Sequence, residues 1–560
     1  MNRLSNPIEN LRDNYDIVVI GSGYGGSISA NRLARAGKAV CILERGREIL
    51  PGEYPDTPKK MSKEIQINTS KKKIGSKLGL FDFDINEQVN VIKGCGLGGT
   101  SLINANVSIM PDKSIFTNGA WPKEIVNDLD NIYNVYAERA RDMLRPVSYP
   151  EDFPELVKLT VLEKMAAYMQ KPFFRLPINV TFKTGPNHVG VEQKACINCG
   201  DCVTGCNHYA KNTLIMNYLP DAKNHGASIF TCIQVTYIEK ETDGWYVHIE
   251  NTEPGRTVSV HRIKANKVIV AAGTLGSTEI LLRSKIKGLS LSDRVGFRFS
   301  GNGDYIGFGY NTTAECNSIG FGNRNPEGRQ PVGPCITGII DMRKETDVHK
   351  RLIIEDCSMP GATATYLMVL GLALATVPLG KETGHGIKNW IGDKWRQLVS
   401  LLCGPYKGAV RNTQGFLTAS IDDGAGVIYL KDDRPRINWP DAGHSGNYKA
   451  VNEDMYLATK AFKGNYIRNP LWNKLLGYDL ISAHPLGGCI MADDATTGVV
   501  NHKCQVYSGT SGKEVYQGLY VMDGSVIPSA LCANPLLTIS SIAERGCSLM
   551  ANDEGMSIPY

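Results

Sequence analysis

Four cysteines lie close together in the chain with a spacing that is suited to metal chemistry. Cys196, Cys199, Cys202 and Cys206 form C-x2-C-x2-C-x3-C within KACINCGDCVTGCNHYAKNT. Bacterial ferredoxins bind iron-sulfur clusters through this spacing, whereas structural zinc sites usually show two separated CxxC pairs. Asn207 follows where ferredoxins usually have proline, and no second run exists to share the fourth ligand. The run predicts an iron-sulfur centre, with a cluster-free loop as the alternative that stays open.

A glycine-rich turn near the start of the chain is suited to binding a dinucleotide. Gly21, Gly23, Gly25 and Gly26 follow the apolar run YDIVVI, and Glu44 ends the next apolar run. In a GxGxxG fingerprint the glycines allow a tight turn, close approach of the pyrophosphate, and packing of the helix on the strand. The helix N-terminus adds positive partial charge, and the acid accepts hydrogen bonds from the ribose. This pattern predicts a dinucleotide site but does not distinguish NAD from FAD.

Three further blocks resemble one family of flavoenzymes. They read VIKGCGLGGTSLINANV (91–107), VIVAAGTLGSTEILLRS (268–284) and, near the carboxy terminus, HPLGGC. With the fingerprint they resemble the flavin-binding signatures of the glucose-methanol-choline (GMC) oxidoreductases, and among these the cholesterol oxidase branch, in the family's order. The resemblance implies that the dinucleotide is FAD. Because residues 94–107 lack the histidine through which some relatives attach the flavin, we expect FAD to be bound non-covalently.

The resemblance also assigns cofactor-contacting positions. Gly94, Gly98 and Gly99 form a loop of little bulk, which lets backbone amides reach the flavin or its phosphates. Asn104 matches a family asparagine that contacts the cofactor, and Val235 matches a position whose backbone reads the adenine. The remaining expected cofactor positions are Thr100, Ala272, Gly273, Asp523, Gly524 and Pro535.

Two residues near the carboxy terminus resemble the family's active-site pair. They are His484 in SAHPLGGC and Asn534 in CANPLLT. Oxidation of an alcohol by a flavin removes the hydroxyl proton and the carbinol hydride, and a neutral imidazole is suited to accept that proton. Asn534 could donate to the substrate oxygen or the flavin edge. We also expect Asn534 to cap a helix that begins at Pro535, whose positive end would stabilise the reduced flavin.

Glu355 is a third candidate for the active site. In cholesterol oxidases a glutamate in a Glu-x-x-x-Met-Pro stretch faces the substrate and serves as a base, and LIIEDCSMP (352–360) places Glu355 at that position. A carboxyl group in an apolar pocket would have a raised pKa and could shuttle protons, including in double-bond isomerisation. The alternative is an acid on a surface strand.

The elements that must position these residues have α/β character. Apolar runs at 15–20 and 39–43 with a helical stretch between them predict a βαβ unit, and LYVMDG precedes a helix at PLLTISSIAERGCSLM. We expect a Rossmann-like FAD-binding domain with an interleaved α+β substrate domain, which is the GMC oxidoreductase fold. The expected segments are 1–50, 213–305 and 480–560 for FAD binding, and 51–212 and 306–479, with the cysteine run and an apolar lid, for the substrate.

Two neighbouring segments are unusually apolar. Residues 366–377 are too short to span a bilayer and Pro378 interrupts them, while residues 387–402 present a broad apolar helical face. We expect core or substrate-lining helices. The alternative is a lid or a surface that contacts a membrane, as extraction of a lipid substrate would require.

Charge and cysteine usage limit the class of protein. The 61 basic and 56 acidic residues are spread along the chain and give a net charge of +5, so the basic patch of a nucleic-acid-binding protein is not expected. The fifteen cysteines are not arranged as in a secreted disulfide scaffold, and the first residues do not resemble a signal peptide. We expect a cytoplasmic location, with association at a membrane surface as the alternative.

Together these features predict an enzyme. We expect FAD-dependent oxidation of an alcohol to a carbonyl by hydride transfer to flavin N5, with a small lipophilic or sterol-like substrate and with oxygen or a redox carrier as electron acceptor. One alternative is a non-sterol alcohol or sugar dehydrogenase that relays electrons through an iron-sulfur centre. The other is a flavin electron-transfer protein that oxidises no alcohol.

Overall fold

The strand that precedes the glycine-rich turn, β1 (Asn14–Ile20), lies inside an eight-stranded sheet. The computed structural model describes residues 2–253, 261–383, 387–474 and 477–560. β1 pairs in parallel with β2 (Val40–Leu43), from early in the chain, and with β15 (Arg262–Val270), from its middle. β15 in turn pairs in parallel with β26 (Val515–Val521), from near the end of the chain. The other strands are β12 (Ser228–Phe230), β13 (Ile233–Glu241), β14 (Gly244–Asn251) and β25 (Gln505–Tyr507).

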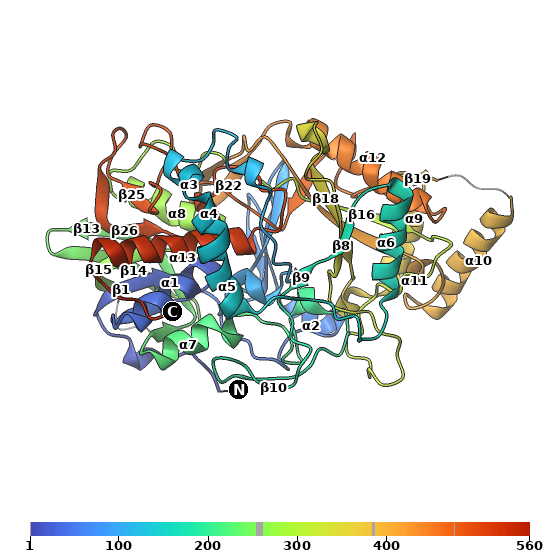
Figure 1. Cartoon of the computed structure of the whole chain (residues 1–560), viewed down its shortest axis with the longest axis horizontal. Coiled ribbons are helices and arrows are strands. Elements are labelled where there is room, and N and C mark those ends of the chain that lie inside the picture. Colours follow the sequence, from blue (N-terminus) through green and yellow to red (C-terminus); the bar gives the residue numbers. More distant parts are fainter. Residues whose placement is uncertain (1, 254–260, 384–386, 475–476) are drawn as a thin grey trace.

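Helices cover this sheet, as its nearly continuous apolar strands require. The helix α1 (Tyr24–Arg35) packs against α7 (Tyr218–Asn224) and against the carboxy-terminal helix α13 (Leu536–Asp553), drawn in red beside it in Figure 1. Arg32 of α1 forms a buried ion pair with Glu544 of α13 at 2.8 Å. The first and last segments of the chain are therefore held together directly. A further helix, α8 (Gly273–Ile286), packs on β13.

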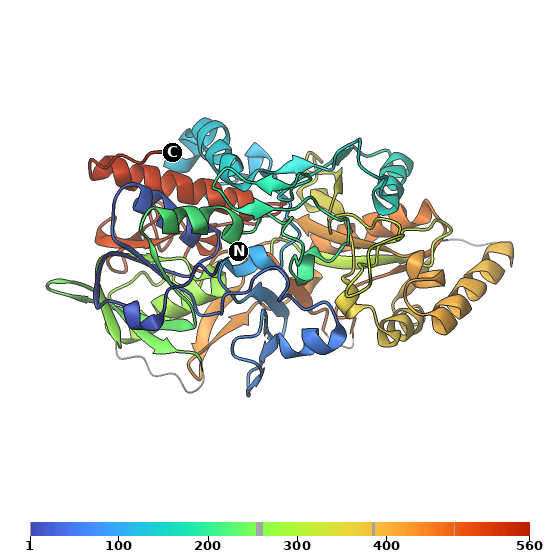
Figure 2. The ribbon, with the colours of Figure 1, turned by 90° about the horizontal axis from the view of Figure 1, so that it is seen from below.

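A five-stranded sheet lies near the centre of the molecule, where Figure 2 shows its amino-terminal strands in blue. Its last strand in sequence, β24, leads directly into the segment that carries His484, and β6 leads into the second glycine-rich loop. The strands are β3 (Ile65–Asn68), β4 (Lys73–Gly75), β5 (Phe81–Asp84), β6 (Val89–Gly94) and β24 (Leu480–Ser482), with the short helix α2 (Pro58–Lys63) before them.

The other half of the molecule is built on a seven-stranded, largely antiparallel sheet. The helices α6 (Val157–Met169) and α12 (Gly446–Lys460) pack on one of its faces and form a core with it. Its strands are β8 (Phe173–Arg175), β16 (Tyr305–Tyr310), β17 (Gly338–Asp341), β18 (Leu352–Cys357), β19 (Gly380–Glu382), β20 (Gln414–Ser420) and β23 (Asn465–Ile467).

Smaller elements complete the chain. They are α3 (Lys123–Asn127), α4 (Leu129–Asn131), α5 (Ala137–Leu144) and α11 (Gly408–Arg411), and the strand pairs β7 (Val147–Ser148) with β9 (Pro177–Ile178), β10 (Gly185–Pro186) with β11 (Glu192–Gln193), and β21 (Val427–Lys431) with β22 (Arg434–Asn438). The predicted α/β class and the βαβ opening are confirmed. The predicted domain segments stay a prediction.

The expectation that the two apolar segments would be core or substrate-lining helices is wrong. The helices α9 (Tyr366–Ala375) and α10 (Ile387–Cys403) form an arm at the edge of the seven-stranded sheet, and α10 projects from the body in Figure 1. Val369 is buried, but Leu367 is 78% exposed and Trp395 is 65% exposed. The arm lies beyond β19, where no further layer of described residues covers its apolar face.

Candidate active site

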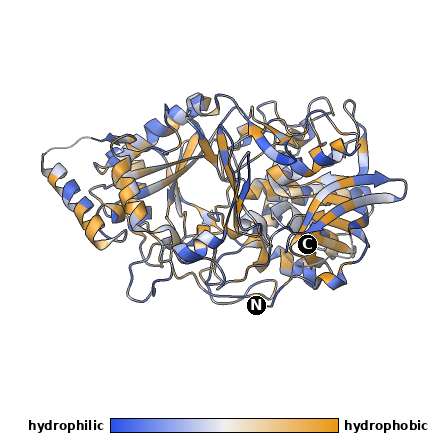
Figure 3. Cartoon of the chain, turned by 180° about the vertical axis from the view of Figure 1, so that it is seen from behind, coloured by the Kyte–Doolittle hydropathy of each residue, from blue (hydrophilic) through white to orange (hydrophobic). Residues whose placement is uncertain are grey.

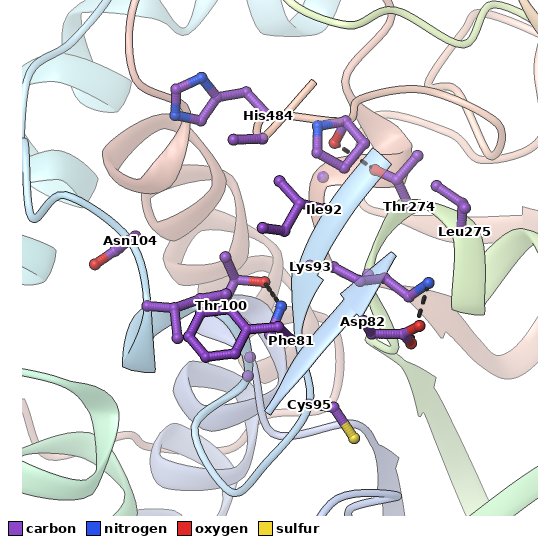
Figure 4. Close-up of a pocket in the computed structure, with 18 of the residues that line it drawn as sticks. Phe81, Asp82, Ile92, Lys93, Cys95, Thr100, Asn104, Thr274, Leu275 and His484 are labelled. Carbon is purple, nitrogen blue, oxygen red and sulfur yellow. Dashed lines mark hydrogen bonds and ion pairs between the residues drawn. The ribbon is translucent and has the colours of Figure 1, made fainter. Parts of the chain in front are cut away.

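A cavity of about 630 Å³ lies between the three large sheets. The predicted catalytic residues His484 and Asn534 line it, whereas Glu355, Gly26 and Gly98 do not. Figure 4 shows side chains of β5, β6 and the following loop converging on it, with His484 at one end. The predicted cofactor residues that line it are Gly21, Gly23, Gly25, Glu44, Gly94, Gly99, Thr100, Asn104, Val235, Ala272, Gly273, Asp523, Gly524 and Pro535. Residues far apart in sequence are thus gathered around one space.

The fingerprint glycines form a cradle between β1 and α1. A Cβ on Gly25 would overlap the carbonyl oxygen of Met522, and one on Gly26 would overlap that of Gly21, which itself has a φ of +94°. A Cβ on Gly23 would meet no protein atom within 4 Å, because this residue faces the cavity. No side chain caps the start of α1, so its first amides remain available to an anion. The turn therefore fits a pyrophosphate.

Glu44 is held at the end of β2 by the same turn. One carboxylate oxygen accepts hydrogen bonds from the Ser22 amide at 3.1 Å and from its hydroxyl at 2.6 Å, and the other accepts from the Gly46 amide at 2.8 Å. The side chain is buried but lines the cavity. These bonds orient the carboxylate toward the space beside the glycines, where a ribose would lie.

Asp523 joins the predicted cofactor position Gly273 to the carboxy-terminal segment. Its carboxylate accepts from the Gly273 amide at 2.8 Å and from the Ser277 hydroxyl at 2.5 Å, and also from the Ser525 amide at 2.8 Å. Burial raises the pKa of Asp523, and these hydrogen bonds oppose that change. The bonds fix the start of α8 beside residues 523–525, on the cavity wall.

The second glycine-rich loop contributes one residue of a hydrogen-bonded pair, Asn104 and Tyr24, of which only Asn104 was predicted from the sequence. Asn104 donates a hydrogen bond to the hydroxyl of Tyr24 at 2.8 Å, and Thr100 accepts one from the Gly94 amide at 3.1 Å. All four residues line the cavity. Because Tyr24 lies inside the fingerprint, its position in the motif could have predicted that it lies near a bound dinucleotide.

His484 is oriented by a carboxylate that the sequence did not reveal. Asp304, which directly precedes β16, lies 2.7 Å from His484 Nδ1, and its other oxygen accepts from the Ala483 and His484 amides at 2.8 and 2.9 Å. Burial lowers the pKa of His484, but the charge and hydrogen bond of Asp304 raise it, and the net result is a pKa above the usual value. No sequence signal beyond the glycines around it (GNGDYIG) marks Asp304.

Asn534 does not cap the last helix, contrary to the expectation from the sequence. The N-cap position of α13 is Pro535, and no side chain caps it. Asn534 instead donates to Glu355 Oε2 at 3.3 Å. The helix begins one residue later than expected, so Asn534 is not at its N-cap position and its amide meets the buried carboxyl group of Glu355 instead. Pro535 and Leu536 still line the cavity, so the start of α13 faces it.

Glu355 is buried in the seven-stranded sheet, not on a surface strand. The register places Ile306, Leu417, Glu355 and Ile339 in one cross-strand row on β16, β20, β18 and β17. Directly paired residues of antiparallel strands share a face, so apolar neighbours flank the carboxyl group. Burial raises its pKa to about 8, while the Asn534 hydrogen bond and His484 oppose that change. Glu355 Oε1 and Asn534 Oδ1 find no hydrogen-bond partner among the described residues.

Sequence reasoning also missed a charged network on the cavity wall. Asp82 of β5 lies 2.6 Å from Arg45 and 3.2 Å from Lys93 of β6, and Lys93 also pairs with Asp84. Figure 4 shows Asp82 and Lys93 together. The alternating FDFD at 81–84 was a usable signal, because it places both acids on one face of a strand.

The cysteine run does not form a metal site. Cys196, Cys199, Cys202 and Cys206 line a cavity of about 20 Å³, which holds about one water molecule and is far too small for a cluster. Throughout the ranges described, no group of three or more His, Cys, Asp or Glu side chains could hold a metal ion. The arrangement of these four side chains therefore does not fit an iron-sulfur centre.

Comparisons with known proteins agree along the chain. The GMC oxidoreductase family is matched by its amino-terminal model over residues 15–300 and by its carboxy-terminal model over residues 450–543. Cholesterol oxidase from Mycobacterium tuberculosis is 27% identical, with 97% of this chain and 92% of that protein covered. Cholesterol oxidase from Acinetobacter baumannii is 26% identical, with 95% and 94% covered. The solved structure of pyridoxine 4-oxidase from Mesorbium loti has a TM-score of 0.62 at 13% identity, covers 96% and 99% of the chains, and shows the same fold.

Proposed function

Because the chain belongs to the GMC oxidoreductase family and is an FAD-dependent oxidoreductase acting on alcohols, we propose that its substrate is a lipophilic, sterol-like alcohol and that His484 accepts the hydroxyl proton. The observation that carries the proposal is the position of His484, which is held by Asp304 on the wall of the same cavity that the dinucleotide cradle lines.

The residues present fit FAD. The amides of the Gly21–Gly26 turn would hold its pyrophosphate, Glu44 its ribose, and the segment from Asp523 to Leu536 would lie along the flavin. When bound, FAD supplies a hydride acceptor for the carbinol carbon. The start of α13 faces this end of the cavity with a positive partial charge that would favour the anionic reduced flavin.

His484 is suited to act as a base. The hydrogen bond between Nδ1 and Asp304 favours the tautomer that carries its proton on Nδ1, which leaves the Nε2 lone pair for the substrate hydroxyl. The raised pKa makes the imidazole a stronger base than usual but requires that it be unprotonated at the start of the reaction. Asn534, which lines the same cavity, would donate to or orient the substrate oxygen.

Apolar side chains line the cavity along β16, the strand that follows Asp304. Ile306 and Phe308 lie on one face of β16, and Leu417 of β20 pairs with Ile306. A row of this kind would bury the hydrocarbon of a sterol or long-chain alcohol while the hydroxyl meets His484. Two relatives are named cholesterol oxidase, which supports the sterol class and oxygen as electron acceptor.

The proposal is tested by anaerobic reduction of the bound flavin with matched alcohols. We expect cholesterol and long-chain primary alcohols to bleach the flavin much faster than glucose, methanol or choline, because only the former bury apolar area along β16. Admission of oxygen should then restore the flavin spectrum. Faster bleaching by the polar alcohols would contradict the substrate class, and no bleaching by any alcohol would contradict the alcohol-oxidising function.

A Glu355→Gln variant should reveal the protonation state of this carboxyl group. Because burial raises its pKa to about 8, the group is neutral below that pH and charged above it. We therefore expect the variant to reduce its flavin within about threefold of the parent rate at pH 7 and to lose any change in rate near pH 8. The measurement is the rate of anaerobic flavin reduction from pH 6 to pH 9. A variant that keeps the change near pH 8 would assign it to another group.

We further propose that the exposed arm contacts an anionic lipid bilayer from which the substrate is drawn. Figure 3 shows hydrophobic residues along the projecting arm. Its large exposed apolar side chains are Tyr366, Leu367, Leu370, Leu374, Val377, Trp390, Ile391, Trp395, Leu398, Leu401 and Leu402, and the exposed Lys394 and Lys407 lie beside them. Aromatic, apolar and basic side chains together favour an interfacial position on anionic lipid. Side chains of residues 387–389 lie outside the described part.

No helix within the described residues is long and apolar enough to cross a membrane. The described residues of the arm do not line the large cavity, so a lid over the active site is not what the geometry supports. A surface that binds bilayers would instead place the enzyme beside its substrate.

Replacing Leu367, Val377 and Trp395 together with serine should weaken binding to vesicles of phosphatidylcholine with phosphatidylserine by about tenfold or more, because three exposed apolar anchors are lost. Co-sedimentation with the vesicles measures the partition. The control is Ile286→Ser, because Ile286 is 75% exposed but lies at the end of α8, away from the arm. Equal losses in both variants, or self-association of the chain without vesicle binding, would contradict membrane contact.

A further inference from the structure

Two cysteines that the proposed reaction does not use face each other on the wall of the active-site cavity. Cys335 precedes β17 and Cys357 ends β18, and their Sγ atoms lie 3.8 Å apart. Both residues line the cavity. Cys357 lies two residues from Glu355 on the same strand, so both side chains emerge on the same face of the sheet. The thiols are thus close to one another on the cavity wall, where Cys357 is partly exposed and Cys335 is buried.

The surroundings of Cys335 differ from those of the other buried thiols and of Cys357, whose pKa lies well above the usual value. Burial raises the pKa of Cys202, Cys316 and Cys489 to about 12. In contrast, a hydrogen bond from Cys357 lowers the pKa of Cys335, and the Lys158 ammonium adds to this effect while burial opposes it.

Lys158 is placed firmly enough to exert that effect. Its ammonium donates to the Cys335 carbonyl at 3.2 Å and to the Thr337 hydroxyl at 3.0 Å, and it pairs with the buried Asp356. A fixed cation beside a thiol increases its thiolate fraction, and the thiolate is the form that reacts with oxidants.

We propose that Cys335 and Cys357 are a redox-active pair that a hydroperoxide converts into a disulfide inside the substrate cavity. The Cys335 thiolate attacks one oxygen of hydrogen peroxide, the O–O bond breaks, and a sulfenic acid and, after protonation, one water form. The Cys357 thiol then attacks the Cys335 sulfur. The S–O bond breaks, and the hydroxide leaves with the thiol proton as a second water. Two thiols are oxidised and one peroxide is reduced to two water molecules.

The disulfide would act on the reaction through the shape of the cavity. Closing the 3.8 Å gap to a covalent bond draws the segment before β17 toward the end of β18. Ser358, Met359 and Pro360 follow Cys357 directly and also line the cavity. Oxidation is therefore expected to hinder substrate entry, and reduction to restore it.

Peptide mass spectrometry of the FAD-loaded enzyme tests the pair directly. After a brief treatment with hydrogen peroxide and alkylation of the remaining thiols, we expect a linked peptide that contains Cys335 and Cys357, with two fewer free thiols in each chain. Dithiothreitol should remove the link. Cys335→Ser should abolish the link, and Cys403→Ser, which removes an exposed thiol far from the cavity, should keep it.

Activity gives a second readout, with each protein compared with its own untreated sample. We expect peroxide to lower the parent rate severalfold, dithiothreitol to recover it, and the Cys335→Ser rate to change little. This readout rests on the proposed alcohol oxidation, whereas the mass readout does not, so the two proposals can fail separately. The inference would be overturned if Cys335 and Cys357 stayed reduced while Cys403 reacted. It would also be overturned if Cys357 were oxidised to the same extent in Cys335→Ser as in the parent.

Discussion

Replacing His484 with alanine should slow reduction of the bound flavin by about 10² to 10⁴-fold while FAD stays in place. The hydroxyl proton must leave as the hydride moves, and His484 is the group placed to accept it. The fingerprint turn and Glu44, which would bind the nucleotide, belong to other segments. The loss should therefore appear in the chemical step and not in cofactor content.

Stopped-flow reduction under anaerobic conditions measures this rate, with the visible spectrum of each preparation as the control for FAD content. Reoxidation of the reduced flavin should change less than reduction, because no alcohol proton is moved in that half of the cycle. A His484→Ala protein that holds FAD and reduces it at the parent rate would exclude His484 as the base.

The pH dependence adds a matched test through Asp304. The parent rate should fall as the pH drops below the raised pKa of His484, because a protonated imidazole cannot accept the proton. In Asp304→Asn the carboxylate that raises this pKa is gone, so the fall should move to lower pH. The maximal rate should also decrease, because the amide no longer fixes the tautomer. An unchanged profile would show that another group controls it.

Local sequence patterns predicted the nucleotide half of the fold well. The turn at Gly21–Gly26 could be predicted from residue types alone, because a Cβ on Gly21, Gly25 or Gly26 would overlap backbone atoms. The helix at the carboxy terminus was likewise visible from its apolar spacing. The exposed arm was misjudged for a physical reason: an apolar helix has the same pattern whether it is covered or not, and coverage depends on where the sheet ends.

Site residues that lie within a recognisable sequence motif could be predicted. Contacts between residues that are far apart in the sequence could not. His484 and Asn534 lie in blocks that resemble family motifs, but the link from Asn534 to Glu355 depends on β18 lying next to residues far away in sequence. Asp304 likewise meets His484 only because β16 and β24 come together. The cysteine run shows the reverse case, since its spacing suggests a metal site that the folded loop does not form.

Replacing Gly23 with valine should have the largest effect on cofactor content, with the ratio of FAD to protein reduced by about tenfold or more. A Cβ at this position meets no protein atom within 4 Å, so the apoprotein should fold normally, yet the side chain would project into the space where the pyrophosphate must approach the backbone. Gly371→Val is the matched control, because a Cβ there also meets no atom within 4 Å but lies on α9, away from the cavity. Visible absorbance gives the flavin content and thermal unfolding reports the fold. A Gly23→Val protein as yellow as the parent would show that the pyrophosphate is bound elsewhere, and a parallel loss in Gly371→Val would show that the flavin is lost through a general change in folding.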